Sequence, residues 1–430
     1  MNAQDGMMAL DDLRVLDLAG PSGVYCTKLL ADLGADVIRV EPPGGDATRR
    51  IGPFFQDDPD PEKSLHFFQF NTNKRSVTLD LENEQGRELF RALVKSTDIV
   101  VETFAPGYLA SIGLDYAALQ ALNPGLILVS ITGFGLDGPY RDFQASDLVV
   151  QALTGLMYTI GFPEDPPVAI GASQTYHMAG AHAAIGALMA LYHREATGAG
   201  QWVDVPVEGA CMRMADMVAL MYWVEGTVRK RSGFEFYRGV QDVWPCQDGH
   251  VICSALGGGG ADTILEWMES EGMAGDLRTE EYADVIAAIK GAAMGSRGGG
   301  GVGAKAHPKM RDLKADQKHV EEVWQAFLLS HTKEELLVGA QTRGIVLMPV
   351  NTAKDIVEDI GLAERHYFVE VEHPELGCCL KYPGAPYQLA ETPWSLRRRA
   401  PRIGEDNAAV YGGLGISQEQ LDSLRAAKVI

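Results

Sequence analysis

The chain has 430 residues, enough for two or three domains or for one large domain with an excursion. Its 37 lysines and arginines stand against 58 aspartates and glutamates, and the net charge of −21 disfavours nucleic acid as a partner because polyphosphate would be repelled. Without a long apolar run, a basic N-terminal segment or paired cysteine spacings, we expect no membrane span and no export, and reduced thiols in a cytoplasmic protein.

The first part of the chain alternates short apolar runs with helical patterns. Residues 13–18 predict a buried strand, residues 24–33 have helical spacing, and residues 36–40 predict a second strand. The alternation continues with a strand at 76–81, a helix at 83–95, a strand at 98–102, a helix at 115–121 and a strand at 126–134. Such βαβ connections imply a parallel sheet, and strands rich in Val, Ile and Leu fit a sheet covered by helices. We therefore predict an α/β fold.

The pattern changes in the second part of the chain. Residues 176–194 predict a helix of small residues that ends at the glycines of 197–201, and a basic linker begins near residue 226. Residues 242–254 predict a hairpin that turns at Asp248-Gly249. Further helices are expected at 261–271, 279–293, 316–329, 332–341, 352–360 and 417–427, strands within 369–384, a capping box at Thr332 and Glu335, and a low-complexity loop at 295–303.

The common catalytic and cofactor motifs are absent. The turn at residues 19–23 has only two glycines where a dinucleotide fold has G-x-G-x-x-G, so a nicotinamide cofactor is weakly supported. The ten histidines show no metal-ligand spacing, and no metal site is expected. His177 and His182 lie five residues apart in the predicted helix, which favours packed helix residues over catalytic bases.

Polar segments, three of which contain glycine, lie at the ends of predicted elements, where functional loops belong. They cover residues 39–46, 71–76, 102–107 and 133–141. Lys74 and Arg75 place a point charge beside a planar guanidinium, a pair that suits a phosphate or a carboxylate. A solvated turn is the other interpretation of this pair.

Together these segments resemble the family III CoA-transferases. The matching stretches include LLADLGADVIRVEPPGGD, FQFNTNKRSVTLDL, DIVVETFAPG and NPGLILVSITGFGLDGPY, and the matches run over nearly the whole chain in family order. The resemblance implies a Rossmann-like large domain with a parallel sheet built from both chain ends, a smaller α+β domain, and an interlocked dimer. It divides the chain into 1–225, 226–350 and 351–430, with the last part returning to the large domain.

The resemblance also implies the chemistry. A CoA thioester would be a substrate and not a permanently bound cofactor, and its contacts would include Ser22, Arg39, Lys74 and Arg75. In the transferases an aspartate attacks the thioester carbonyl, forms a mixed anhydride and releases the CoA thiolate, which splits one difficult step into two easier ones.

This chain departs from the family at the nucleophile. The family's aspartate lies seventeen residues before the position of His193, and counting back reaches Tyr176. The surrounding IGASQTYHMAGAH contains no Asp or Glu, and a phenol with a pKa near 10 is a poor nucleophile at neutral pH. Ala105 and Ser111 stand where the family often has arginines that touch CoA phosphates.

Three hypotheses remain open. In the first, the chain is the non-catalytic subunit of a hetero-oligomeric transferase, for example from succinyl-CoA to an aromatic succinate, and a paralogous partner supplies the aspartate. In the second, it performs altered chemistry on a CoA ester, as a lyase, hydratase or isomerase, and the candidate acids and bases are Tyr176, His177, Asp147 and Glu102. In the third, it is an ordinary transferase with Asp147 as nucleophile, although a helix-capping role also explains Asp147. The racemases of the family need a histidine before this aspartate, and here Ser146 precedes it.

Overall fold

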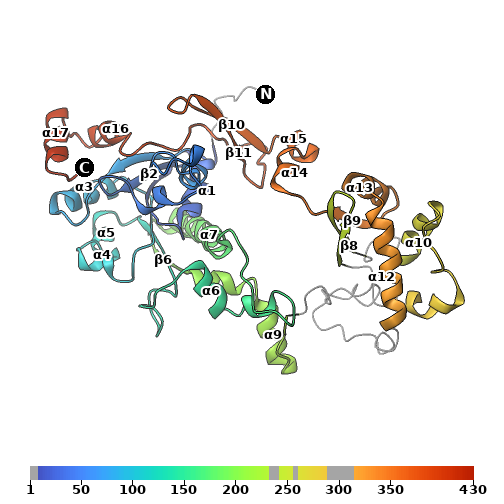
Figure 1. The fold of residues 1–430 in the computed structure, drawn as a ribbon. Helices are drawn as coiled ribbons and strands as arrows, with labels where there is room; N and C mark the ends of the chain where they lie inside the picture. The colour runs from blue at the N-terminus through green and yellow to red at the C-terminus, as the bar shows by residue number, and fades with distance from the viewer. Residues whose placement is uncertain (1–7, 232–241, 255–259, 288–313) are drawn as a thin grey trace. The chain divides into compact units, whose positions relative to one another are not determined.

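The computed structural model describes residues 8–231, 242–254, 260–287 and 314–430 (Figure 1). The expected loop at 295–303 and the last part of the expected helix at 279–293 lie outside the described residues. The chain divides into two compact units: unit 1 comprises residues 1–157, 169–216 and 360–430, and unit 2 comprises residues 158–168 and 217–359. The larger unit thus contains both ends of the chain.

A six-stranded parallel sheet forms the centre of unit 1, in the order β3-β2-β1-β4-β5-β6. The strands are β1 (Arg14–Leu18), β2 (Asp36–Glu41), β3 (Arg75–Thr78), β4 (Ile99–Glu102), β5 (Ile127–Thr132) and β6 (Trp202–Pro206). This confirms the predicted α/β class with a parallel sheet. The expectation that both chain ends supply strands to the sheet is wrong, because all six strands lie between residues 14 and 206.

Helices cover both faces of the sheet (Figure 1). In unit 1 they are α1 (Val24–Asp32), α2 (Leu65–Asn71), α3 (Glu84–Val94), α4 (Tyr108–Ser111), α5 (Tyr116–Leu122), α6 (Asp147–Leu153), α7 (Gln174–Thr197) and α8 (Val207–Met212), with short 3-10 turns at η1 (Ala47–Arg50) and η2 (Phe55–Asp57). The small residues of α7 allow close packing, since a Cβ at Gly180 would lie 3.0 Å from the main-chain nitrogen of Cys26 in α1. The helix ends at Gly198 in the left-handed conformation, which confirms the predicted glycine stop.

The C-terminal part of unit 1 adds helices and a hairpin. These elements are α15 (Ile360–Glu364), β10 (Phe368–His373), β11 (Cys378–Pro383), α16 (Asn407–Gly412) and α17 (Gln418–Ala426). Strands β10 and β11 pair antiparallel as a separate two-stranded sheet. Helix α16 docks on the β3 edge: the hydroxyl of Tyr411 donates to the carbonyl of Thr78 at 2.8 Å, and the side chain of Asn407 bonds the main-chain nitrogen and hydroxyl of the same threonine.

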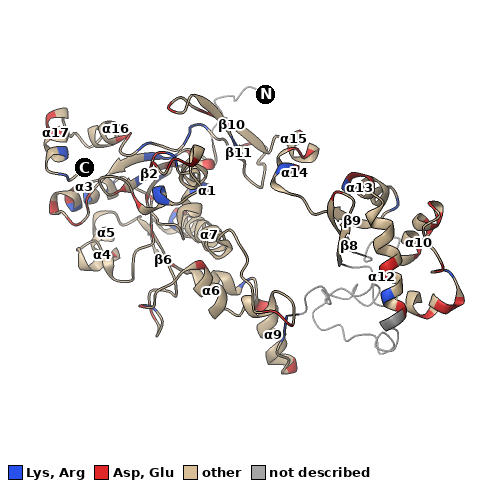
Figure 2. Ribbon diagram, in the orientation of Figure 1, with Lys and Arg blue, Asp and Glu red and all other residues tan. Residues whose placement is uncertain are grey.

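Unit 2 is built on a three-stranded antiparallel sheet in the order β7-β8-β9. Its elements are β7 (Asp242–Cys246), β8 (Gly249–Ser254), α10 (Gly260–Ser270), η5 (Glu280–Tyr282), α12 (Lys314–Leu329), α13 (Lys333–Thr342), β9 (Val346–Pro349) and α14 (Ala353–Val357); η3 (Met157–Thr159) and α9 (Asp216–Glu225) begin at the boundaries between the units. The predicted hairpin and the capping box of Thr332 and Glu335 are confirmed, but the hairpin turns at Gln247-Asp248, one residue earlier than expected, because Gly249 already pairs with Cys246. Figure 2 shows acidic residues on helices of both units, including α3 and α10.

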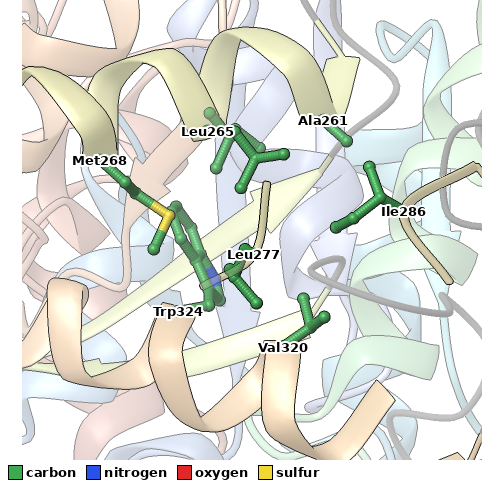
Figure 3. A pocket seen from close by; sticks show the side chains of 8 residues that line it. Ala261, Leu265, Met268, Leu277, Ile286, Val320 and Trp324 are labelled. Atoms are coloured by element: carbon green, nitrogen blue, oxygen red, sulfur yellow. The ribbon is translucent and has the colours of Figure 1, made fainter. Parts of the chain in front are cut away.

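A small apolar pocket lies in the core of unit 2 (Figure 3). Trp324 of α12 and Met268 of α10 face it, together with Leu277 and Ile286. Its volume of about 10 Å³ is at the lower limit for a single water molecule. The pocket is therefore a packing defect of the core and not a ligand site.

Candidate functional site

A cavity of about 450 Å³ lies in unit 1 at the carboxyl ends of β1, β4 and β5. Ser22 follows β1, residues 103–106 follow β4, and Thr132 ends β5. The strand order reverses between β1 and β4, and in open parallel sheets ligands bind at such a point. The lining residues are Ser22, Thr103, Phe104, Ala105, Pro106, Ile131, Thr132, Gly133, Arg141, Asp142, Phe143, Gln144, Ala145, Val150, Tyr176 and Val207.

The lining combines aromatic rings with hydroxyl groups and few charges. The only charged side chains among the lining residues are Arg141 and Asp142, which pair with each other at 3.3 Å and are well exposed. Ala105 lies in the same wall and carries no charge. An anionic ligand would therefore meet one guanidinium here, with aromatic and hydroxyl contacts around it.

Tyr176 lies in the first turn of α7 and lines the cavity. Its phenolic oxygen accepts a hydrogen bond from the main-chain nitrogen of Asp147 at 3.1 Å. Burial raises the pKa of the phenol above its usual value of about 10, and the nearby Asp147 carboxylate acts in the same direction. The phenol is therefore protonated at neutral pH and is a poor nucleophile.

Asp147 does not line the cavity. One carboxylate oxygen accepts from the main-chain nitrogen and the hydroxyl of Thr175, at 3.0 and 2.6 Å, and the other accepts from the side chain of Gln151 at 2.7 Å. The helix cap of α6 is Ser146, whose hydroxyl accepts from the nitrogen of Val149, so the expectation that Asp147 itself caps this helix is wrong. The carboxylate instead fastens the start of α7 to α6.

The two histidines of α7 that the sequence singled out, His177 and His182, are each bonded to a main-chain carbonyl four residues earlier. His177 is bonded to the carbonyl of Ser173 at 3.1 Å, and its ring contacts Tyr25 and Phe70. His182 is bonded to the carbonyl of Met178 at 2.9 Å. Neither lines the cavity, as the helical pattern predicts for packed residues.

Arg39 and Lys74 belong to a buried network of ion pairs around Asp17 of β1. Both contact the carboxylate of Asp17, Arg39 at 3.0 Å and Lys74 at 2.9 Å, and all three side chains are almost fully buried. Lys74 also donates to Thr27 and Asn71. Burial alone would raise the pKa of Asp17, but the two cations outweigh it and lower that pKa to about 2. Burial lowers the pKa of Lys74 to about 8 against the opposing effect of Asp17.

Neither cation lines the cavity, and the terminal nitrogens of Arg39 and the ammonium of Lys74 donate to groups within the protein. Arg75 pairs with Asp36 and also lies outside the lining. Of the four residues expected to contact CoA, only Ser22 lines the cavity. In this geometry Arg39, Lys74 and Arg75 form ion pairs within unit 1, and their contacts with CoA stay a prediction.

The polar lining residues that the sequence did not single out individually include Thr103 and Thr132. Thr103 follows β4, and its hydroxyl accepts from the main-chain nitrogen of Gly20 at 2.7 Å, which ties two walls of the cavity together. Thr132 ends β5. Their place at the carboxyl ends of predicted parallel strands was the available signal. Within the described residues no group of three or more metal-ligating side chains occurs, and no helix there is long and apolar enough to span a membrane.

A family model described as CoA-transferase family III matches residues 10–407. The chain therefore belongs to this family, and its enzyme class is CoA-transferase, as the sequence motifs predicted.

The chain is 35% identical to succinyl-CoA:(R)-benzylsuccinate CoA-transferase subunit BbsE of Thauera aromatica, over 96% of this chain and 95% of that protein. It is 32% identical to succinyl-CoA–D-citramalate CoA-transferase of Chloroflexus aurantiacus over the whole of both chains. It is 35% identical to formyl-CoA:oxalate CoA-transferase of Streptomyces avermitilis, over 98% of this chain and 99% of that protein. Among solved structures, a CaiB/BaiF family protein from Brucella suis superposes with a TM-score of 0.79 at 29% identity, covering 95% of this chain and 99% of that one.

Proposed function

We propose that this chain is the non-catalytic subunit of a family III CoA-transferase that moves CoA from succinyl-CoA to an aromatic succinate. A paralogous subunit carries the nucleophilic aspartate. The observation that carries this proposal is Tyr176, which stands in the cavity at the position where the family motif has a carboxylate. A relative with 35% identity is itself named as a subunit of a benzylsuccinate transferase, which supports both the substrate class and the divided architecture.

The charged residues that line the cavity support the proposal that this chain is not catalytic. Asp142 is the only carboxylate among the lining residues, and it is exposed and paired with Arg141. A nucleophilic carboxylate needs a fixed position close to the thioester carbonyl, which an exposed surface side chain does not provide. The partner's site would perform the exchange, and this chain would contribute structure and contacts for CoA.

An exposed apolar face of α7 supports assembly with a partner chain. Ile185, Met189 and Tyr192 recur with helical spacing and are 54%, 68% and 82% exposed. Contiguous exposed apolar residues of this size mark interaction surfaces. The proposal therefore includes an interlocked dimer of this chain with its paralogue. It also includes CoA thioesters as the substrates of this dimer and the cytoplasm as its location.

Asp147 as the nucleophile is the second candidate. Its main-chain nitrogen bonds Tyr176, but both of its carboxylate oxygens already accept hydrogen bonds from Thr175 and Gln151. To act as a nucleophile, this carboxylate would have to break its hydrogen bonds with Thr175 at the start of α7 or with Gln151 in every turnover. The geometry favours the first candidate.

The test is an exchange assay with succinyl-CoA as donor and benzylsuccinate as acceptor. We expect no exchange by the purified chain alone, and exchange when it is co-expressed with a paralogue that has an aspartate at the matching position. Replacement of that aspartate in the partner by alanine abolishes the activity of the complex. Exchange by the isolated chain would overturn the proposal.

A further inference from the structure

A row of polar side chains crosses the sheet at the carboxyl ends of β4, β5 and β6. Glu102 pairs in register with Ser130, and Ser130 pairs with Asp204, so the three side chains share one face of the sheet. Glu102 and Ser130 are buried, whereas Asp204 is exposed on the edge strand. The mechanism proposed above makes no use of this row.

Hydrogen bonds connect the row to the cavity wall. The indole nitrogen of Trp202, on the exposed edge strand β6, donates to the hydroxyl of Ser130 at 2.9 Å. Ser130 is hydrogen-bonded in turn to the carboxylate of Glu102. The other contact of Glu102 is the main-chain nitrogen of Phe104, which donates to it at 2.6 Å. Phe104 belongs to residues 103–106, the wall of the 450 Å³ cavity that follows β4.

A second, smaller cavity of about 50 Å³ lies behind this wall. Glu102 lines it, and the titratable groups that face Glu102 from neighbouring elements are Asp115 and Tyr116 at the start of α5 and Asp204 on β6. None of the residues lining this smaller cavity is basic. Within the described part of the chain, the carboxylate of Glu102 is held by hydrogen bonds and is paired with no cation.

We infer that Glu102 is a positioning residue, whose carboxylate fixes the main chain of Phe104 and with it the 103–106 wall of the CoA-ester cavity. The inference rests on the proposed function only in treating that cavity as the site for a CoA ester. Glu102 does not line the large cavity itself, so it acts on a ligand through Phe104.

Ionisation of Glu102 sets the pH range in which the wall is held. Burial raises the pKa of Glu102 to about 7, and Asp204 adds to the increase while the hydrogen bonds from Ser130 and Phe104 oppose it. An ionised carboxylate is a stronger acceptor than a neutral carboxyl group. The bond from Phe104 is therefore strongest above about pH 7 and weakens as the pH falls below that value.

Hydrogen–deuterium exchange of the Phe104 amide in the full ligand-free chain tests this inference. After correction for the intrinsic rate, protection in the wild-type chain is expected to rise about tenfold between pH 6 and pH 8. In Glu102→Gln the amide oxygen accepts at every pH, so protection does not change with pH. In Glu102→Ala protection is lost throughout. A flat wild-type profile, or full protection in Glu102→Ala, would overturn the inference.

Asp204→Asn is the matched control, because Asp204 holds the main-chain nitrogen of Leu136 at 3.0 Å and not that of Phe104. We expect this variant to keep the change in Phe104 protection and to move its midpoint to lower pH, since a repelling charge is removed. Loss of the change in this variant would contradict the assignment to Glu102.

Calorimetric titration with CoA separates this inference from the proposed function. Glu102→Ala is expected to bind CoA several-fold more weakly than wild type at pH 8, and Glu102→Gln close to wild type. Equal CoA affinity in all three proteins would refute the positioning role. If none of the three proteins binds CoA but the pH dependence of Phe104 protection is present, the proposed contribution of this chain to CoA binding fails, and the role of Glu102 in holding the wall stands.

Discussion

The main-chain nitrogen of Asp147 donates a hydrogen bond to the phenolic oxygen of Tyr176 at 3.1 Å. This contact joins the first residue of α6 to the first turn of α7. Tyr176, at the family's nucleophile position, therefore accepts a hydrogen bond from the backbone through its phenolic oxygen. The arrangement gives Tyr176 a structural function that requires no chemistry at its oxygen.

Tyr176→Phe is expected to lower the free energy of unfolding by about 1 kcal/mol, because the nitrogen of Asp147 loses its acceptor. The exchange rate of the co-expressed complex should stay close to wild type, since the phenol does not react. Urea unfolding and the succinyl-CoA exchange assay measure the two effects. A collapse of turnover with unchanged stability would instead favour acid–base chemistry at Tyr176.

Tyr176→Asp restores a carboxylate at the same position. We expect the isolated variant to remain inactive, because the cations expected at Ala105 and Ser111 are also absent and Arg141 is the only basic residue among those lining the cavity. Steady exchange by this variant alone would show that the nucleophile was the only missing group.

Asp147→Asn is expected to lower the free energy of unfolding by about 1 to 3 kcal/mol. Gln151 cannot turn to accommodate an amide, because its own amide group bonds both the carbonyl and the nitrogen of Ile170. The new NH₂ group must therefore face a donor, from either Gln151 or Thr175. Hydroxylamine treatment of the wild-type chain with succinyl-CoA should give no hydroxamate at Asp147; a modified Asp147 in the mass spectrum would establish it as the nucleophile.

The parallel sheet could be predicted from the sequence because its strands are nearly continuous apolar runs separated by helical spacing. Strand β6 was not predicted, since its sequence WVDVP is short and carries an aspartate, as befits an edge strand with an exposed face. The expectation that the C-terminal part adds strands to the parallel sheet was wrong, because β10 and β11 form a separate sheet and α16 buries Tyr411 against the β3 edge without joining it.

The location of the site could also be predicted, because the polar segments 102–107 and 133–141 follow predicted parallel strands. The buried ion pairs of Arg39 and Lys74 could not be predicted from the sequence. Their neighbour Asp17 lies on β1, and only the spatial order of the strands brings it to both cations. A basic residue in a polar loop has the same local sequence whether it binds a phosphate or pairs with a buried carboxylate.

Lys74→Met tests that distinction. Removal of the ammonium leaves the buried Asp17 with Arg39 as its remaining cation, and we expect a loss of about 3 to 5 kcal/mol in the free energy of unfolding. Lys63→Met is the control: Lys63 pairs with Asp58 at the surface, and its loss should leave the free energy of unfolding close to that of the wild type. Weakened CoA binding with unchanged stability in Lys74→Met would restore Lys74 as a phosphate ligand.

Glu102→Gln should change how stability depends on pH. The pKa of Glu102 is raised from 4.5 to about 7, so between these values the folded chain holds a proton that the unfolded chain has released. The unfolding free energy of the wild type therefore falls as the pH rises through this window, by about 3 kcal/mol from this group. Relative to wild type, the variant should gain stability from pH 5 to pH 8 in urea unfolding. A constant difference between the two proteins would place the pKa of Glu102 near its ordinary value.

Ala105→Arg should strengthen the binding of CoA by this chain. Ala105 is exposed in the cavity wall, so the larger side chain costs little stability, and it adds a guanidinium where Arg141 is otherwise the only cation among the lining residues. We expect a gain of about three- to tenfold in calorimetric affinity, equivalent to one charge-assisted contact with a phosphate. The gain should shrink when the salt concentration rises from 50 mM to about 500 mM, because exposed ion pairs are screened. Ser111→Arg provides the parallel variant at the second position. No gain in Ala105→Arg would mean that CoA phosphates do not pass this wall, and the CoA contacts of the complex would then belong to the partner subunit.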